Sequence, residues 1–485
     1  MAEMSSDFWR SALEEALKRG ASYADVRSSE ILNEFLTVKN GEPDAVNFLQ
    51  TKGFGIRVIA DGAWGFAGSV VMDKEEITRT VKKAVEVARA SALMKKRDAI
   101  LIPQKTARAK YSTPVKKDPF KCSLEDKLDV LVQASRKLKE HSPLIKASYA
   151  NYHGFRENKI FNSTEGAELS QQITWCGGGV RAIAVKNGEM QSRSYPSAFN
   201  GDFATSGYEF FESLALIDHT ERVGQEVLSL FDAENSPSGQ MDVILTGDQL
   251  ALQTHESCGH PTELDRALGT EADYAGTSFL TPEKLGNFNY GSDKVNIVAD
   301  ATVARGLGTF GYDDEGTPAK RVFLIKEGIF VGYQSSRETA AELKLEESSG
   351  GMRADSPLAL PIIRMTNVNL LPGDWRAEEI VEDTKDGLLM MTNRSWSIDD
   401  RRLNFQFGTE IGWRIKDGSK EEMIKNPTYM GVTPQFWGSC DAVSDDDWMM
   451  HGTPNCGKGV PGQVMYVGHG CGTARFRKTQ VGLLR

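Results

Sequence analysis

The residue types with the greatest capacity for chemistry lie in one short segment, which contains His255, Glu256 and His260. Two imidazoles can hold a zinc ion, and a carboxylate beside the first ligand can act as a general base toward water that attacks a carbonyl carbon. Once protonated, the same carboxylic acid can protonate the leaving amine. The order H-E-x-x-x-H resembles the H-E-x-x-H motif of zinc peptidases with one extra residue. From the pattern alone, the two histidines could also be polar residues at a helix end.

The spacing of the two histidines restricts the local backbone. Four residues apart on a regular helix they would differ by about 40° around the axis, whereas five residues apart they differ by about 140°. His255 and His260 can therefore share a metal only if the helix unwinds or bulges between them. Gly259 offers backbone freedom just before His260, and Pro261 disfavours the α conformation for His260. The sequence thus predicts an irregular helix end at this point.

A catalytic zinc needs a third protein ligand and keeps its fourth position for water. The residue types that could supply this ligand are found at Cys258, Glu263, Asp265, Cys440, His451, Cys456, His469 and Cys471. Cys258 is too close to the histidines in the chain to join them without strain, and Glu263 or Asp265 could orient a ligand instead of binding metal. Cys456 lies in a Gly-rich segment that we interpret as a loop, whose backbone could approach a site closely.

The whole chain has the composition of an ordinary globular protein, with 40% hydrophobic and 26% charged residues. The formal net charge of −10 disfavours nucleic acid as a partner, because phosphate binding needs a basic face. Met1 to Arg10 lacks the apolar core of a secretory signal, and no stretch approaches the roughly 20 apolar residues of a membrane span. Six cysteines are too few for a disulfide framework. We therefore expect a cytoplasmic protein with free thiols and no membrane partner.

The first half of the chain contains the same order of elements twice: a helix, several strands and a second helix. The helical patterns cover about residues 8–17, 74–93, 123–141 and 208–230. The strands between them include the similar segments 55–57 (GIR) and 179–181 (GVR), and Asn40-Gly41 is a turn signal. We expect an N-terminal α+β domain, residues 1–235, built from two similar helix–meander–helix units.

The character of the sequence changes after residues 232–240, a polar segment with Ser, Pro and Gly that we interpret as a linker. A short helix is expected to run into His255. Beyond it, short apolar runs alternate with turn signals, which is typical of antiparallel strands. The predicted fold class is therefore α+β, with a C-terminal antiparallel β-rich domain, residues 236–485, that carries the metal-binding helix.

Several other charged residues have ordinary structural interpretations. Asp313, Asp314 and Glu315 could bind a peptide amine, but their residue types favour a hairpin turn. Arg353 and Arg364 could pair with a peptide carboxylate, but solvated surface positions are favoured.

Four segments together resemble one known family. Residues 255–265 (HESCGHPTELD) resemble the H-E-x-x-G-H-x-x-E-x-D signature of TldD proteins. Residues 313–318 (DDEGTP), 364–373 (RMTNVNLLPG) and 455–459 (NCGKG) are similar to further segments of the same family and occur in the same order. The segments at 55–57 and 179–181 also resemble the family's N-terminal domain. Because the matches together span nearly the whole chain, the sequence is identified as a member of the TldD/PmbA family.

The resemblance implies a cytoplasmic zinc metallopeptidase that acts on unfolded peptide segments and is linked to modulation of DNA gyrase. The family's zinc ligands fall on His255, His260 and Cys456, and its catalytic glutamate falls on Glu256. Family members dimerise, so a homodimer or a heterodimer with a paralogue is expected. Residues 396–408 depart from the Gly- and Ser-rich stretch of many relatives.

Three other functions are compatible with parts of the pattern. The chain could be the non-catalytic subunit of a heterodimeric protease, although the intact Glu256 and ligand set argue against this. It could hold a structural zinc, with His469 or Cys471 as a fourth ligand. A role as a DNA-binding or gyrase-binding modulator is disfavoured by the acidic charge.

Overall fold

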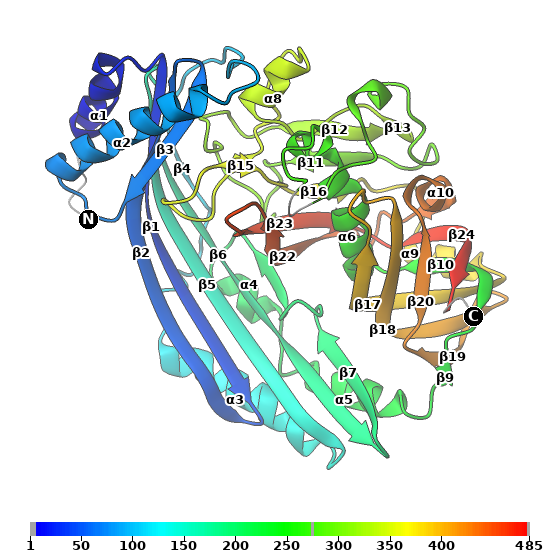
Figure 1. The fold of residues 1–485 in the computed structure, drawn as a ribbon. Helices are drawn as coiled ribbons and strands as arrows, with labels where there is room; N and C mark the ends of the chain where they lie inside the picture. The colour runs from blue at the N-terminus through cyan, green and yellow to red at the C-terminus, as the bar shows by residue number, and fades with distance from the viewer. Residues whose placement is uncertain (1–5, 273–275, 483–485) are drawn as a thin grey trace.

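The computed structural model describes residues 6–272 and 276–482, and it shows a strand-rich α+β protein as the sequence predicts (Figure 1). None of the helices within these ranges is long and apolar enough to cross a membrane. The predicted division into domains 1–235 and 236–485 stays a prediction.

Four long strands dominate the first half and belong to one eight-stranded sheet (Figure 1). The sheet has the order β3-β2-β1-β5-β6-β4, with β7 and β8 paired to β6. The strands are β1 (Tyr23–Lys39), β2 (Glu42–Ala60), β3 (Ala63–Ser69), β4 (Arg108–Ser112), β5 (Ile145–Ser163), β6 (Glu168–Lys186), β7 (Glu189–Tyr195) and β8 (Asp202–Ala204). Asn40-Gly41 and Asn187-Gly188 have positive φ at both positions, which is the geometry of tight hairpin turns. The antiparallel pairing of β1 with β5 joins the two helix–strand–helix segments into one sheet.

The helices of the first half are α1 (Ser6–Lys18), α2 (Lys74–Ala92), α3 (Leu124–Glu140), α4 (Tyr208–Ser213) and α5 (Thr220–Ser229). The side chain of Ser123 accepts a hydrogen bond from the backbone N–H of Asp126 and so fixes the start of α3. The single helix expected over 208–230 is wrong, because α4 and α5 are separate. Leu214 and Leu216 are both buried between them, and residues two apart cannot share one face of a helix.

The second half is built on a mixed eight-stranded sheet of order β17-β10-β24-β20-β18-β19-β9, with β21 beside β24. Its strands are β9 (Glu234–Asn235), β10 (Gly239–Leu245), β17 (Asp386–Ile398), β18 (Asn404–Lys416), β19 (Ser419–Lys425), β20 (Thr428–Val432), β21 (Cys440–Val443) and β24 (Ala474–Val481). Most neighbouring strands pair antiparallel, as the sequence predicts, but β10 pairs with β17 and β9 with β19 in parallel, which the sequence does not predict. The long excursion of the chain between β10 and β17 permits the parallel pairing.

Smaller elements surround this sheet. They are β11 (Ile297–Asp300), β12 (Arg321–Lys326), β13 (Ile329–Phe330), β14 (Met352–Arg353), β15 (Ile362–Ile363), β16 (Val368–Leu370), β22 (Met449–Lys458), β23 (Gln463–Cys471), α6 (Gly247–Thr254), α7 (Leu264–Ala267), α8 (Arg337–Glu342), α9 (Ala377–Glu382) and α10 (Thr433–Gly438). Helix α6 lies against β17 and β23, and β22 lies against β8 of the first sheet. Helix α6 and the β22–β23 hairpin thus lie between the two large sheets (Figure 1).

The charged turn at residues 313–315 joins the two halves of the molecule. The turn itself is as expected, but its carboxylates are buried. Asp314 pairs with Arg27 at 3.1 Å and with Lys159 at 2.7 Å, and Glu315 lies 3.5 Å from Arg57. Burial alone would raise the pKa of Asp314, but the two cations lower it below its ordinary value. The turn is therefore an internal ionic contact with the first sheet.

Arg353 and Arg364 are also buried, so the expectation of surface positions is wrong. Arg353 donates to the carbonyl oxygen atoms of Met365 and Tyr466, and Arg364 donates to those of Gln463 and Cys456. Each buried guanidinium is thus hydrogen-bonded to backbone carbonyl groups, as buried polar groups in native proteins usually are.

Replacing Asp314 with asparagine should lower the free energy of unfolding by about 3 kcal/mol, because Arg27 would remain buried without its carboxylate partner and Lys159 would lose the nearer of its two, keeping only Glu157 at 3.4 Å. Chemical denaturation of the variant beside the wild type measures the change. Asp44→Asn, at an exposed position, is the matched control and should be neutral. If Asp314→Asn lowered the free energy of unfolding no more than Asp44→Asn does, this would contradict a stabilising role for the ionic contact.

Candidate metal centre

The helix that carries the histidines bulges between them. Helix α6 ends at Thr254, and residues His255–Gly259 continue it as a π-helical turn. The backbone N–H of His260 bonds to the carbonyl oxygen of His255, which is the five-residue closure of a π-turn. This closure places His255 and His260 on the same side of the helix, so the bulge that shared ligation requires is present. The turn of a 3₁₀ helix, His260–Thr262, follows.

The backbone at Gly259 and His260 differs from what the sequence suggested. Gly259 has φ −66° and His260 has φ −61° and ψ −43°, so both keep α-like backbone. The packing of this fully buried segment overrides the preference that Pro261 imposes on His260. Glycine is required at 259 for a different reason: a Cβ there would lie 2.1 Å from Sδ of Met365. Close packing, and not conformational freedom, selects this glycine.

Gly259→Ala should therefore lower the free energy of unfolding by about 1–3 kcal/mol through overpacking against Met365. The double variant Gly259→Ala, Met365→Ala should recover part of this loss, because the colliding sulfur is removed. Thermal unfolding of the single and double variants measures both effects. A double variant that is less stable than the sum of the two single changes would show that the contact with Met365 is not the cause.

Three donor atoms converge at the π-turn. His255, His260 and Cys456 each offer a ligand atom, these atoms lie within 4.8 Å of one another, and all three residues are buried. Nε2 of His260 is 3.8 Å from Sγ of Cys456. Tetrahedral zinc with ordinary bond lengths would separate a nitrogen and a sulfur ligand by about 3.6 Å. Two imidazoles and a thiolate therefore fit zinc in chemistry and in spacing.

Hydrogen bonds orient both imidazoles. Nδ1 of His469 lies 3.0 Å from the carbonyl oxygen of Val368 and must donate to it. Nε2 of His469 then accepts from Nδ1 of His255 at 2.8 Å. Nδ1 of His260 lies 2.9 Å from the carboxylate of Glu263. Each of the two candidate ligands thus presents Nε2 to the cluster, and His469 acts as a hydrogen-bond partner of His255.

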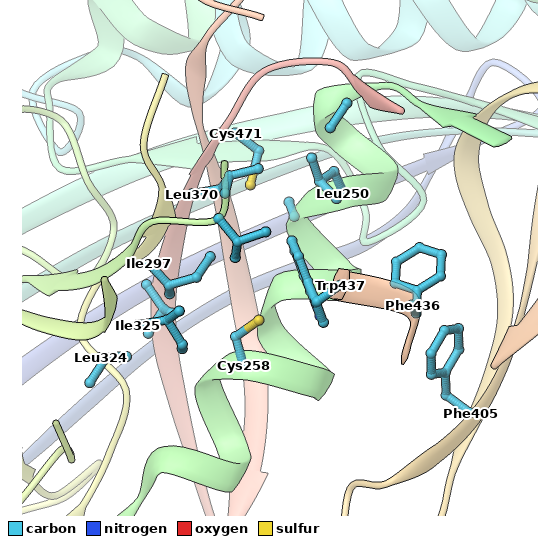
Figure 2. Close-up of a cluster of buried hydrophobic side chains, with 14 of the residues drawn as sticks. Leu250, Cys258, Ile297, Leu324, Ile325, Leu370, Phe405, Phe436, Trp437 and Cys471 are labelled. Carbon is cyan, nitrogen blue, oxygen red and sulfur yellow. The ribbon is translucent and has the colours of Figure 1, made fainter. Parts of the chain in front are cut away.

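Cys456 does not lie in a loop as expected, but within strand β22, opposite Met465 of β23 and beside a bulge. Burial opposes ionisation of its thiol, yet Arg364 and His260 together lower the pKa of Cys456 below its ordinary value. The other two thiols near this helix point elsewhere. Figure 2 shows Cys258 and Cys471 among the hydrophobic side chains of the core, and burial raises the pKa of both.

The two acidic residues that follow His260 form a buried ionic group. Glu263 pairs with Arg266 at 3.3 Å and with Lys458 at 3.4 Å, and Asp265 accepts from Lys458 at 2.8 Å. Burial alone would raise the pKa of Glu263, but Lys458 and His260 hold it well below its ordinary value. An ionised Glu263 is a strong acceptor for the imidazole N–H of His260. In this geometry Glu263 orients a ligand.

Glu256 contacts Arg402, a residue that no motif in the sequence singles out. Its Oε2 lies 2.6 Å from Nη1 of Arg402, which belongs to the connection between β17 and β18. The only sequence signal was the departure of residues 396–408 from the usual composition of the segment. A carboxylate and a guanidinium therefore stand together beside the first histidine.

Three family models match consecutive parts of the chain. PmbA/TldA metallopeptidase domain 1 matches residues 24–88, the central domain matches residues 117–230, and the C-terminal domain matches residues 238–483. A metalloprotease from Methanocaldococcus jannaschii is 30% identical, with 95% of this chain and 97% of that protein covered. A zinc metalloprotease TldD homolog from Saccharolobus solfataricus is 23% identical, with 97% and 98% covered.

Two solved structures share the fold. One is TldE from Thermococcus kodakarensis, with a TM-score of 0.75, 16% sequence identity, and 98% of this chain and 100% of that chain covered. The other, from Thermotoga maritima, was solved as a candidate modulator of a DNA gyrase; it has a TM-score of 0.77, 19% identity, and coverage of 98% and 99%.

Proposed function

This chain belongs to the PmbA/TldA metallopeptidase family, the TldD/PmbA family of the sequence resemblance, and on that premise we propose that it is a zinc-dependent endopeptidase. The proposed zinc ligands are His255, His260 and Cys456, and the proposed general base is Glu256. The observation that carries the proposal is the convergence of three donor atoms within 4.8 Å on one side of a π-turn. Glu256 directly follows the first of these ligands in the chain.

The number of donors favours a catalytic site over a structural one. Structural zinc sites are closed by four protein ligands, whereas catalytic sites keep one position for water or substrate. Over the parts of the chain that the structure describes, no further His, Cys, Asp or Glu joins the cluster. His469, one candidate for a fourth ligand, is engaged through both ring nitrogen atoms. Cys471, the other, contacts Thr254 and lies in the core.

Each residue of the site has a separate role in the proposed reaction. Bound zinc would supply Lewis acidity, which makes water more acidic and polarises a carbonyl group. Glu256 accepts the proton that water loses as it attacks the carbonyl carbon, and it delivers this proton to the departing amine nitrogen. His469 and Glu263 keep the two imidazoles in the orientation that ligation needs.

Burial of the site favours loose chains as substrates. His255, Glu256, His260 and Cys456 are all less than a tenth exposed, so the rigid surface of a folded protein cannot reach them. We propose that an unfolded peptide segment enters in extended form, held through its backbone along a strand edge. We also propose that the protein works in the cytoplasm as a homodimer or as a heterodimer with a family paralogue.

The proposal is tested by measuring metal content and hydrolysis on the same sample. We expect about one zinc per chain, hydrolysis of a reduced and alkylated polypeptide, and no hydrolysis of the same polypeptide in its native, disulfide-bonded form. Removal of zinc with a chelator should abolish hydrolysis, and added zinc should restore it. Bound zinc without hydrolysis, both alone and with a paralogue present, would favour a structural site. A protein that binds no metal would contradict the proposal.

A further inference from the structure

We infer that Arg402 is a catalytic residue of this site, whose guanidinium binds the carbonyl oxygen of the scissile peptide bond and stabilises the negative charge that develops there. The inference rests on the proposed peptidase function and adds to it the group that receives the charge. Three observations support it: the contact of Arg402 with Glu256, the backbone geometry of Arg402, and the difference in exposure between Arg402 and its neighbour Arg401.

The backbone of Arg402 is held in a conformation that its side chain does not favour. Its φ of +64° lies in the left-handed region, which is uncommon for a residue with a side chain. The N–H of Arg402 bonds to the carbonyl oxygen of Asp399, and the hydroxyl of Thr433 donates to the carbonyl oxygen of Arg402 at 2.9 Å. The carboxylate of Asp399 also accepts from the backbone N–H of Leu403 and Asn404. Such backbone strain persists only where the surroundings enforce it, and it is concentrated at functional sites.

This geometry directs the guanidinium to the carboxylate of the general base. The Nη1 atom of Arg402 lies 2.6 Å from Oε2 of Glu256, and the two side chains are 17% and 9% exposed. Burial lowers the pKa of Arg402, while the carboxylate of Glu256 raises it. Arg401, by contrast, is exposed, and its carbonyl oxygen accepts from the N–H of Phe279. One of two adjacent arginines is therefore turned into the site and the other into solvent.

The reaction moves negative charge from one neighbour of Arg402 to another. At the start, the charge is on the carboxylate of Glu256. As an O–H bond of water breaks, the proton goes to Glu256, the water oxygen bonds to the carbonyl carbon, and the carbonyl oxygen becomes the anion. A guanidinium has five N–H donors in a fixed plane, so it can bind this oxygen without leaving Glu256. The proton then passes to the amine nitrogen as the C–N bond breaks, and the carboxylate of Glu256 forms again.

A preorganised hydrogen-bond donor aimed at a developing oxyanion raises kcat by a factor of about 10²–10³. We therefore expect Arg402→Ala to lose about 10²–10³ in kcat with KM changed less than about threefold, and Arg401→Ala, the matched control, to behave as the wild type. Added guanidinium ion should restore at least about a tenth of the lost kcat in Arg402→Ala and should not accelerate Glu256→Gln. Arg402→Lys keeps a cation beside Glu256, so it should fold and bind zinc as the wild type does while kcat stays reduced.

Affinity for a transition-state mimic provides a readout independent of turnover. A phosphinic peptide presents a tetrahedral anion, and its affinity should fall by about 10² in Arg402→Ala and Arg402→Lys. The affinity of the product peptide that carries the new amino terminus, and so lacks the new carboxylate, should not change, nor should the zinc content. Wild-type kcat in Arg402→Ala, a rise in kcat that would reveal an inhibitory contact, or a fall that guanidinium cannot rescue would each overturn the inference. Absence of hydrolysis in the wild type would instead contradict the proposed function.

Discussion

Replacing Glu256 with glutamine should reduce kcat by about 10²–10⁴ and leave the zinc bound. Glutamine has nearly the shape of glutamate and can still accept a hydrogen bond from Arg402, but its amide cannot take up a proton from water. The side chain is not one of the three converging donors, so the metal should remain. Steady-state hydrolysis of an unfolded polypeptide, together with metal analysis of the same preparation, measures both quantities.

Glu346→Gln is the matched control for this variant, because Glu346 is exposed and the charge change is the same. It should hydrolyse at the wild-type rate. Wild-type activity of Glu256→Gln would remove this residue from the chemistry and leave a different group as the base. Loss of zinc from Glu256→Gln would show that the glutamate holds the metal, in conflict with the convergence of His255, His260 and Cys456 alone.

Replacing Cys456 with serine should weaken zinc binding by more than about 100-fold and abolish hydrolysis. Loss of a residue that merely orients a ligand costs about 10–100-fold in affinity, and loss of a thiolate ligand removes a direct bond. In the wild type, Arg364 and His260 lower the pKa of Cys456, so that the thiolate form, which binds metal, is favoured. Competition of each variant against a zinc-binding dye measures the affinity.

Cys471→Ser is the matched control, because Cys471 is the other cysteine that the sequence offers as a candidate zinc ligand. Cys471 is buried in the core and lies 3.6 Å from the hydroxyl of Thr254, so its replacement should leave zinc affinity and kcat as in the wild type. If Cys471→Ser lost as much zinc affinity as Cys456→Ser, this would contradict the assignment of the thiolate ligand to Cys456 alone.

Local patterns in the sequence predict much of the first half of the fold. The Asn-Gly turns, the helix over 74–92 and the Ser123 cap follow from rules that involve only neighbouring residues. The break between α4 and α5 does not, because it depends on the simultaneous burial of Leu214 and Leu216 in a core formed by distant strands. The parallel pairing of β10 with β17 is equally beyond local patterns, since the partners lie more than a hundred residues apart in the chain.

Some features of the candidate site can likewise be predicted from neighbouring residues, whereas others depend on contacts between distant parts of the chain. The histidine spacing is enough to require a bulge, but the reason for Gly259 is a contact with Met365, a hundred residues away in the chain. The pairing of Glu256 with Arg402 depends on the left-handed turn at the end of β17, which residue types do not reveal. The burial of Arg364 likewise depends on backbone carbonyl groups that only the folded chain brings to it.

The central claim, an open zinc site with three protein ligands, is tested most directly by anomalous diffraction at the zinc absorption edge from crystals of the wild type. We expect a single strong peak about 2.0–2.1 Å from Nε2 of His255 and of His260 and about 2.3 Å from Sγ of Cys456, with Glu256 facing the remaining position. A peak elsewhere, or a fourth protein side chain bound to the metal, would contradict the account.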